Sequence, residues 1–386
     1  MRSEKKTRRF GLRFAALGLA LAFLAASGVR AAEPPVLKGA SAAEKARVMK
    51  LIAGAKKEGK VVFLTNTMGP DVAYPLFEDF KKQYGLPNAK LLHTMKRSGG
   101  VISTMKKDIS AGRHSFDMVQ VGAPIFFNGL HRRGHLMKYD SPNYKLFLPY
   151  VTGEKKGAVA TKKYFISAQV SLRAIVWNKK YVKKNLKTVE DVLDPKYKGK
   201  IVMPDILRSA THVNVYIGLR KVIPRSFFEK LAKLKPIFVL SGRAQIRKIM
   251  TGEMWINFMG GPGTAYKNAL KGAKFFGVSF FPEGTVALGY PMGILSKAPN
   301  PNTVKLWMDY MHSRRGHVKY VKAKGITSPI KNPPDYGPLL AEFAPSLEPL
   351  NKISKVIPID WDKIGPKQVA AARAEWREIF YKGKKN

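Results

Sequence analysis

The feature that most constrains the fold of this chain is an alternation of helix and strand patterns between residues 43 and 121. Residues 43–57, 72–84 and 102–112 place apolar side chains at the spacing of one helical face. The short apolar runs 61–64, 89–92 and 116–121, which follow the three helical segments in turn, are typical of buried strands. Helices that connect strands in this way cover both faces of a sheet of parallel strands, so the sequence predicts an α/β fold.

A second α/β set follows a change of character at residues 164–177, which hold two extended, β-branched and aromatic runs with no helix between them. We expect the chain to cross there into a second lobe and to return near residues 286–295. The second set contains predicted strands at 200–203, 237–240 and 254–258, and helices from about 211, at 225–233 and at 244–250. After the return, helices are predicted at 303–313 and 366–381. The predicted organisation is a signal peptide at 1–31, lobe 1 at 32–168 and 284–345, lobe 2 at 169–283, and a C-terminal helical extension at 346–386.

The N-terminus has the pattern of an export signal. Residues 1–13 carry six basic side chains and one acid, and residues 14–26 are uncharged and apolar. Thirteen residues are too few to span about 30 Å of hydrocarbon. Small residues precede a predicted cleavage after Ala31, and Arg8-Arg9 approximates a twin-arginine signal. The pattern predicts a periplasmic protein exported by the general secretory or the twin-arginine route.

Composition excludes several kinds of site. The chain has no cysteine, which removes disulfides, thiolate metal sites and cysteine nucleophiles. Its formal net charge is +43, yet 45% of the residues are hydrophobic, so it is a folded chain and not a basic disordered tail. Basic residues recur almost everywhere, without the single stripe of a nucleic-acid reader, and we expect no nucleic-acid partner. A basic surface suits anionic membranes or cell walls, or an acidic habitat. One cluster comprises Lys179, Lys180, Lys183, Lys184, Lys196, Lys198 and Lys200.

Two predicted helix starts have the composition of an anion site. Arg97-Ser98-Gly99 begins the helix after the second strand, and Ser209-Ala210-Thr211 begins the helix after strand 200–203. Free N–H groups and the helix dipole favour negative charge at such positions, and a nearby arginine strengthens the effect. The alternative is that Ser98 is simply an N-cap. We interpret the two starts as facing each other across a cleft and holding one anionic group.

Loops after other predicted strands complete the candidate site. The glycine-rich loop after strand 254–258 lacks the lysine and the spacing of a phosphate-binding loop. We interpret it as a loop that a ligand approaches closely, the alternative being a sharp turn. The candidate ligand residues are Thr65, Asn66, Arg97, Ser98, Gly99, Gly122, Ser209, Ala210, Thr211, Asn257, Gly260 and Tyr290.

Metal and catalytic patterns are weak. The pairs His131/His135 and His312/His317 are surrounded by arginines with no acid nearby, so we expect solvent-facing histidines and no metal site. Glu190 and Asp191 are expected to be helix N-terminal charges. No serine–histidine–acid set or paired-carboxylate motif stands out, and we expect no enzymatic activity.

Four segments of the sequence are similar to the extracellular solute-binding proteins of ABC importers, the family that includes ferric-ion, thiamine, polyamine and phosphonate binders. The similarity runs in order from about residue 58 to residue 330. It implies a type II periplasmic-binding-protein fold, in which a cleft between two lobes holds the solute and delivers it to permease and ATPase subunits. We expect a monomer without cofactor. The four segments are Gly59-Lys60-Val61-Val62; Ser98-Gly99 with Phe116-Asp117-Met118-Val119; Asp194-Pro195-Lys196-Tyr197-Lys198-Gly199-Lys200-Ile201; and Gly252-Glu253 through Pro282-Glu283-Gly284 and Pro291-Met292-Gly293-Ile294 to Ala298-Pro299-Asn300-Pro301.

The resemblance also bears on the ligand. Ferric-binding relatives use a histidine, a glutamate and a tyrosine pair, because Fe(III) prefers anionic oxygen donors. The matching places here hold Met68, Gly122 and Pro262-Gly263, with Tyr266 and Tyr290 as the nearest tyrosines. We therefore expect a small anionic or zwitterionic solute, such as an organophosphonate or a carboxylate. Two alternatives remain open, a ferric receptor that uses exogenous anions and a hydrolase built on this fold.

Overall fold

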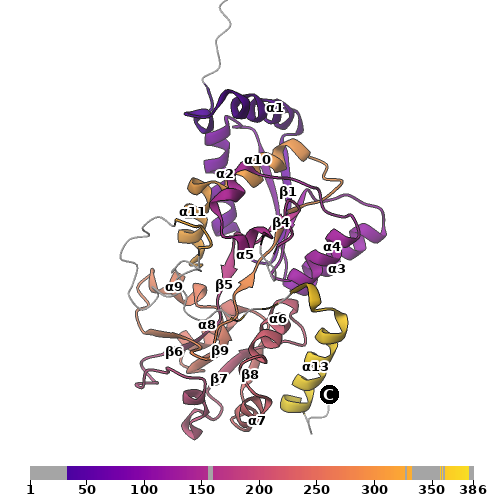
Figure 1. Ribbon diagram of the computed structural model, residues 1–386. Coiled ribbons are helices and arrows are strands. Elements are labelled where there is room, and N and C mark those ends of the chain that lie inside the picture. Colours follow the sequence, from indigo (N-terminus) through magenta and orange to yellow (C-terminus); the bar gives the residue numbers. More distant parts are fainter. Residues whose placement is uncertain are drawn as a thin grey trace, which may run out of the picture.

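The computed structural model describes residues 33–154, 160–326, 328–332, 357, 359 and 361–381. The predicted signal peptide lies outside these residues. So does most of the stretch from residue 333 to residue 360, which precedes the C-terminal helix in the sequence. Figure 1 shows two α/β lobes, one above the other, with the C-terminal helix beside the lower lobe. None of the described helices combines the length and the apolar character that crossing a bilayer requires.

Lobe 1 is built on a five-stranded sheet of order β2-β1-β3-β12-β4. Its strands are β1 (Lys60–Thr65), β2 (Lys90–Met95), β3 (Met118–Gln120), β4 (Phe165–Ile166) and β12 (Met292–Ile294). Strand β1 is parallel to β2 and β3, whereas β12 is antiparallel to β3 and β4. Its helices are α1 (Ala42–Glu58), α2 (Pro70–Tyr84), α3 (Ser98–Ser110), α4 (Pro124–Arg132), α5 (Pro149–Thr152), α10 (Pro301–His312) and α11 (Arg314–Lys324).

Lobe 2 has a second five-stranded sheet, of order β10-β6-β9-β7-β8. Its strands are β6 (Ala174–Asn178), β7 (Ile201–Pro204), β8 (Ile237–Val239), β9 (Ile256–Gly260) and β10 (Phe276–Phe280). Strand β7 is parallel to β8 and β9, and β6 is antiparallel to β9 and β10. Its helices are α6 (Ala210–Leu219), α7 (Arg225–Lys233), α8 (Gly242–Met250) and α9 (Gly263–Ala269), and α13 (Pro366–Tyr381) packs on α6 and α7. Short 3-10 helices lie at Pro35–Leu37, Pro142–Leu146, Glu190–Leu193, Pro195–Tyr197 and Trp361–Lys363.

Two short strands connect the lobes. Strand β5 (Val170–Ser171) leads from lobe 1 into lobe 2, and β11 (Leu288–Gly289) leads back. They pair antiparallel, with Leu288 opposite Ser171 and Gly289 opposite Val170. Both lie in the two stretches that the sequence marks as crossing segments, so the predicted two-lobed α/β class is confirmed. The exact lobe boundaries stay predictions.

Apolar side chains from the predicted periodic stretches fill both lobes. In lobe 1, Phe77 and Phe80 of α2 meet Trp307 of α10 with ring centroids 5.2 and 5.4 Å apart. In lobe 2, Phe227 of α7 packs on Phe258 of β9 at 5.5 Å. Burying one such side chain stabilises the fold by roughly 1.5–3 kcal/mol. These cores hold the sheets rigid, so the loops at their edges are fixed in place.

The prediction of solvent-facing histidines is wrong for His312 and His317, which are fully buried. The His312 Nδ1 donates to the Met308 carbonyl at 2.8 Å, one turn earlier in α10, and His317 shares a 3.1 Å hydrogen bond with the Ser328 hydroxyl. Phe147 packs its ring edge-on to both imidazoles. Burial lowers the pKa of His312 to about 4 and that of His317 to about 3, so both are neutral. His131 and His135 are half-buried.

Candidate functional site between the lobes

The lobe 1 side of the interface is the loop after β1. The Thr65 hydroxyl accepts hydrogen bonds from the N–H groups of Thr67 and Met68, at 3.1 and 3.3 Å, and so fixes the turn. The Asn66 side-chain oxygen accepts from the Gly122 N–H at 3.2 Å, which joins this loop to the loop after β3. Three predicted site residues, Thr65, Asn66 and Gly122, are therefore held together at the carboxyl ends of adjacent parallel strands.

The two lobes touch where the helix starts face each other. The Asn66 Nδ2 donates across the interface to the Thr211 hydroxyl at 3.4 Å. A side chain at Gly99, at the start of α3, would begin 3.8 Å from the carbonyl oxygen of Arg208, just before α6. The predicted juxtaposition of the α3 and α6 starts is thus present, and a Cβ at position 99 would make an ordinary van der Waals contact across it.

The start of α6 is capped by Ser209. Its hydroxyl accepts from the His212 N–H at 3.2 Å and shares a 2.8 Å hydrogen bond with the His212 imidazole. Ala210 is the first helical residue and Thr211 is buried. Burial, followed by the positive charge of Arg173, lowers the pKa of His212 well below its ordinary value. The imidazole is therefore neutral and able to accept or donate one hydrogen bond to a ligand.

Arg173, between β5 and β6, is the most unusual charge in the described part of the chain. Its side chain is buried, with 4% of the residue exposed, and its Nη2 donates to the Tyr290 hydroxyl at 2.9 Å. Its Nε has no hydrogen-bond partner. Among the described residues no carboxylate forms an ion pair with it. Burying a guanidinium without a counter-charge costs free energy, and an anion bound at this position would offset that cost.

Small residues surround this arginine. A side chain at Gly261, after β9, would begin 2.8 Å from the Arg173 Nη1, and one at Gly122 would begin 2.6 Å from the Tyr290 ring. Tyr290, a predicted site residue just before β12, therefore stands between the lobe 1 loop and Arg173. Only glycine at positions 122 and 261 leaves room for this arrangement.

Asn257 on β9 is fully buried, and neither its amide nitrogen nor its carbonyl oxygen has a partner. Its side chain leans over Gly260, where any Cβ would overlap it. The glycine at 260 thus makes space for the Asn257 amide, which the sequence reading did not foresee. Two unpaired polar atoms in a buried amide are costly, and hydrogen bonds from a polar ligand or a water would offset this cost.

The structure places Arg97 differently from what the sequence suggests. Arg97 itself is the N-cap residue of α3, and its side chain is exposed and makes no capping hydrogen bond. Ser98 is the first helical residue and is buried, so the alternative interpretation of Ser98 as an N-cap is wrong. Ser98 and Gly99 reach the interface with α6, whereas an Arg97 contact with ligand stays a prediction.

Sequence reasoning missed Arg173, His212 and the network around Gln169. The Gln169 side chain donates to the Thr67 hydroxyl at 3.0 Å and accepts from the Tyr320 hydroxyl, beside the crossing strands. Lys324 donates to the Thr67 carbonyl. Burial and the charges of Lys267 and Arg243 lower the pKa of Lys324 to about 8. One signal was available, since Gln169 and Arg173 are the large polar side chains of a mainly apolar crossing segment.

The described residues contain no group of three or more histidines, aspartates and glutamates placed to hold a metal ion. Tyr266 is buried in α9, where a side chain at Gly325 would overlap its ring, and Tyr290 accepts from Arg173. Neither tyrosine is arranged as an open phenolate ligand.

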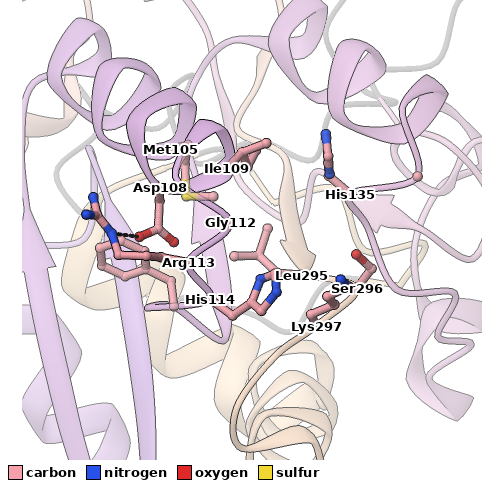
Figure 2. A pocket seen from close by; sticks show the side chains of 12 residues that line it. Met105, Asp108, Ile109, Gly112, Arg113, His114, His135, Leu295, Ser296 and Lys297 are labelled. Carbon is pink, nitrogen blue, oxygen red and sulfur yellow. Dashed lines mark hydrogen bonds and ion pairs between the residues drawn. The ribbon is translucent and has the colours of Figure 1, made fainter.

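A cavity of about 260 Å³ lies elsewhere, at the edge of lobe 1 away from the interface. Figure 2 shows Arg113 paired with Asp108 on one side of it and His135 on the other. Asp108 also accepts from the Ser115 hydroxyl at 2.6 Å and the Ser115 N–H at 3.0 Å. The one carboxylate of this cavity is already satisfied by its neighbours and therefore does not mark a ligand site.

Solved structures share the fold of this chain. AfuA from Actinobacillus pleuropneumoniae, a periplasmic binding protein solved with exogenous fructose-6-phosphate, aligns with a TM-score of 0.69 and 19% identity over 84% of this chain and 99% of its own. Iron-bound HitA from Pseudomonas aeruginosa gives 0.65 and 15% over 83% and 99%. PotD from Streptococcus pneumoniae, a spermidine/putrescine substrate-binding protein, gives 0.61 and 13% over 83% and 98%. The fold is that of periplasmic binding proteins.

The sequence supports the same assignment independently of the fold. Residues 75–340 match the family model described as bacterial extracellular solute-binding protein. No curated protein sequence matches the chain. Because the family match covers more than half of the chain, the protein belongs to the bacterial extracellular solute-binding family.

Proposed function

We propose that the protein is the periplasmic receptor of an ABC importer and that it captures a small anionic solute in the cleft between its lobes. The observation that carries the proposal is Arg173, a buried guanidinium with one hydrogen bond, an unpaired Nε and no ion pair among the described residues. An anionic group at this position supplies the missing counter-charge. Each charge-assisted hydrogen bond in such a place contributes roughly 1.5–3 kcal/mol.

The groups around Arg173 are complementary to a polar solute that carries a carboxylate or phosphoryl group. The α6 N-terminus adds N–H donors and the positive end of a helix dipole. The Asn257 amide, whose nitrogen and oxygen have no partner among the described residues, offers hydrogen bonds to the rest of the solute. A cationic polyamine would place its charge against Arg173, which electrostatic repulsion disfavours. AfuA, of the same fold, is described with a sugar phosphate bound, which agrees with this donor set.

We propose delivery to a permease, a role that the family and the two-lobed architecture support. Two lobes joined by β5 and β11 are able to move as rigid bodies about these strands, and enclosure of a ligand by such a hinge is a common closure mechanism. We propose that the closed, loaded form is recognised by the membrane subunits. The role is that of a carrier, with no catalytic step.

The test begins with a thermal-shift screen of matched pairs, each an anionic solute and its uncharged analogue, followed by calorimetric titration of the best ligand. Arg173→Gln should weaken binding about tenfold to a hundredfold while the ligand-free melting temperature holds or rises, since a buried unpaired charge is removed. The predicted Arg97 contact requires Arg97→Ala to weaken binding about tenfold to a hundredfold. Arg132→Gln, an exposed change on α4, is the control. The proposal is wrong if Arg173→Gln binds the ligand with unchanged affinity, or if the wild-type protein prefers the uncharged analogues.

A further inference from the structure

We propose that the outer end of lobe 2 binds the surface of an anionic phospholipid membrane. We call this surface the basic pole. It lies at the edge of the lobe 2 sheet opposite the candidate cleft, and Figure 1 shows this end of lobe 2 farthest from lobe 1. The basic pole consists of Lys180, Lys183, Lys184, Lys196, Lys198, Lys200 and Lys274, with Tyr181, Trp255 and Phe275.

The sheet brings these residues together from distant parts of the sequence. Strand β6 ends where β10 begins, with Asn178 opposite Phe276, and β7 begins beside β9, with Ile201 opposite Ile256. The Lys179 N–H donates to the Phe275 carbonyl and the Trp255 N–H to the Lys200 carbonyl, each at 2.8 Å. Because neighbouring strands are about 4.8 Å apart, the lysines that flank these ends share one compact surface.

Aromatic rings form the floor of the basic pole. The Lys180 ammonium lies 5.0 Å from the Phe275 ring centre, and the Lys200 ammonium lies 5.2 Å from that of Trp255. Tyr181 stacks on Trp255 with centroids 5.6 Å apart and an interplanar angle of 3°. The ammonium groups therefore lie over the faces of aromatic rings, and a surface that combines cations with aromatic rings suits a water–lipid interface.

The positive charge of the basic pole is only partly balanced. Lys184 pairs with Asp191 at 2.6 Å and Lys196 with Asp194 at 2.7 Å. Lys180, Lys183 and Lys198 are exposed and form no ion pair with a carboxylate of the described residues. The surplus makes an anionic partner the complementary one.

Exposed apolar side chains favour a membrane over a nucleic acid or an acidic protein. Tyr181 is 46% exposed, and Met250 is 40% exposed next to Ile249, whose carbonyl accepts a hydrogen bond from Asn178 at the end of β6. Lysines interspersed with tyrosine and aliphatic side chains are the composition of interfacial segments, in which the cations meet lipid phosphates and the apolar groups enter the headgroup layer. Binding there leaves the cleft, at the opposite edge of the sheet, open to solvent.

The test is co-sedimentation of protein purified from the periplasm with large vesicles of phosphatidylcholine alone or with a quarter of phosphatidylglycerol. Wild type should bind only the anionic vesicles, and less at higher salt. Each lysine near such a surface strengthens binding about fivefold, so Lys180→Glu/Lys183→Glu/Lys198→Glu should weaken binding by at least about thirtyfold.

The matched control is Lys56→Glu/Lys82→Glu/Lys90→Glu, which makes the same change in net charge on exposed lysines of lobe 1. It should weaken binding by less than about threefold, because these lysines lie far from the basic pole. Tyr181→Ser should weaken binding, whereas Tyr74→Ser, an equally exposed tyrosine of α2, should not. Equal losses in the two triple variants, or no binding of wild type to anionic vesicles, would overturn the proposal. Circular dichroism and melting temperatures verify that all variants are folded.

Discussion

At the scale of single residues, burial of polar groups distinguishes structural from functional positions. Asp117 is fully buried, but its carboxylate accepts from the Val62 and Asn300 N–H groups at 2.7 Å each. It therefore fastens the loop before α10 to β1. Arg173 is buried to a similar degree, yet its Nε is unpaired. A satisfied buried charge holds the fold, and an unsatisfied one at an inter-lobe position points to a ligand.

Sequence patterns indicate some residues of the candidate site and not others for a physical reason. Ser209 and Thr211 were identified because a helix start is a local pattern of small hydroxyl residues after a strand. Arg173 was not identified, because only the tertiary fold shows that none of the described residues places a carboxylate beside it. His312 and His317 were misjudged because the adjacent Arg314 and Arg315 indicated a polar face, whereas the helices turn the imidazoles toward Phe147.

The buried histidines predict loss of stability in acid. Their folded pKa values, about 4 and about 3, lie below the ordinary value of 6.5. At pH values between the folded pKa and 6.5, the unfolded chain binds more protons than the folded chain does. The free energy of unfolding therefore falls as the pH drops from 6.5 toward 4. His317→Gln, which keeps a partner for Ser328, should reduce this fall by about 2 kcal/mol at pH 4.5. Urea unfolding of wild type and His317→Gln at neutral and acid pH measures this difference in the free energy of unfolding. If the free energy falls equally with pH in both proteins, His317 is not responsible for the loss.

At the scale of elements, helical and strand periodicity predicted most of the helices and strands to within a few residues. The predicted helices at 225–233 and 366–381 are α7 and α13, with the same limits. The predicted strand at 116–121 is shorter, because only Met118–Gln120 pair in the sheet. Helices α4, α5, α9 and α11 and strand β10 were not identified. The insertion of β12 between β3 and β4 also required the structure, since local patterns contain no information on strand order.

Helix α13 is an integral part of lobe 2. Trp376 is fully buried against Tyr216 of α6, with ring centroids 5.1 Å apart, and the Glu375 carboxylate accepts from the Arg220 Nε at 2.8 Å. These contacts hold α6, whose start faces the cleft. Trp376→Ala should therefore destabilise the protein by about 3–5 kcal/mol. Arg377→Ala, an exposed neighbour, should change stability by less than about 0.5 kcal/mol. Equal melting temperatures for the two variants would show that α13 is a dispensable appendage.

At the scale of the whole molecule, ion pairs join the lobes beside the candidate cleft. Asp71 of α2 in lobe 1 lies 2.8 Å from the Lys267 ammonium and 3.7 Å from an Arg243 guanidinium nitrogen, both in lobe 2. Burial acts to raise the pKa of Asp71, but the hydrogen bond from Lys267 and the two cations outweigh it and lower that pKa. These contacts, with the Asn66–Thr211 hydrogen bond, favour the arrangement in which the lobes touch.

Removing this link should shift the molecule toward an open form. Each partly exposed pair contributes at most about 1 kcal/mol, so Asp71→Asn should change the ratio of closed to open molecules about fivefold. Small-angle scattering of the ligand-free protein should then show a larger radius of gyration. Asp140→Asn breaks a comparable 2.8 Å pair with Lys163 inside lobe 1 and is the control. Identical scattering from all three proteins would rule out this ion pair as a determinant of closure.

The most direct test of the central claim, that Arg173 binds the anionic group of the solute, is a thermodynamic cycle measured by calorimetric titration. Wild type and Arg173→Gln are each titrated with the anionic ligand and with its uncharged isostere. We predict that removing the ligand's charge costs wild type at least about tenfold in affinity and costs Arg173→Gln little, a coupling typical of a desolvated charge pair. If both proteins lose affinity by the same factor, the anionic group is bound elsewhere and the assignment of Arg173 is wrong.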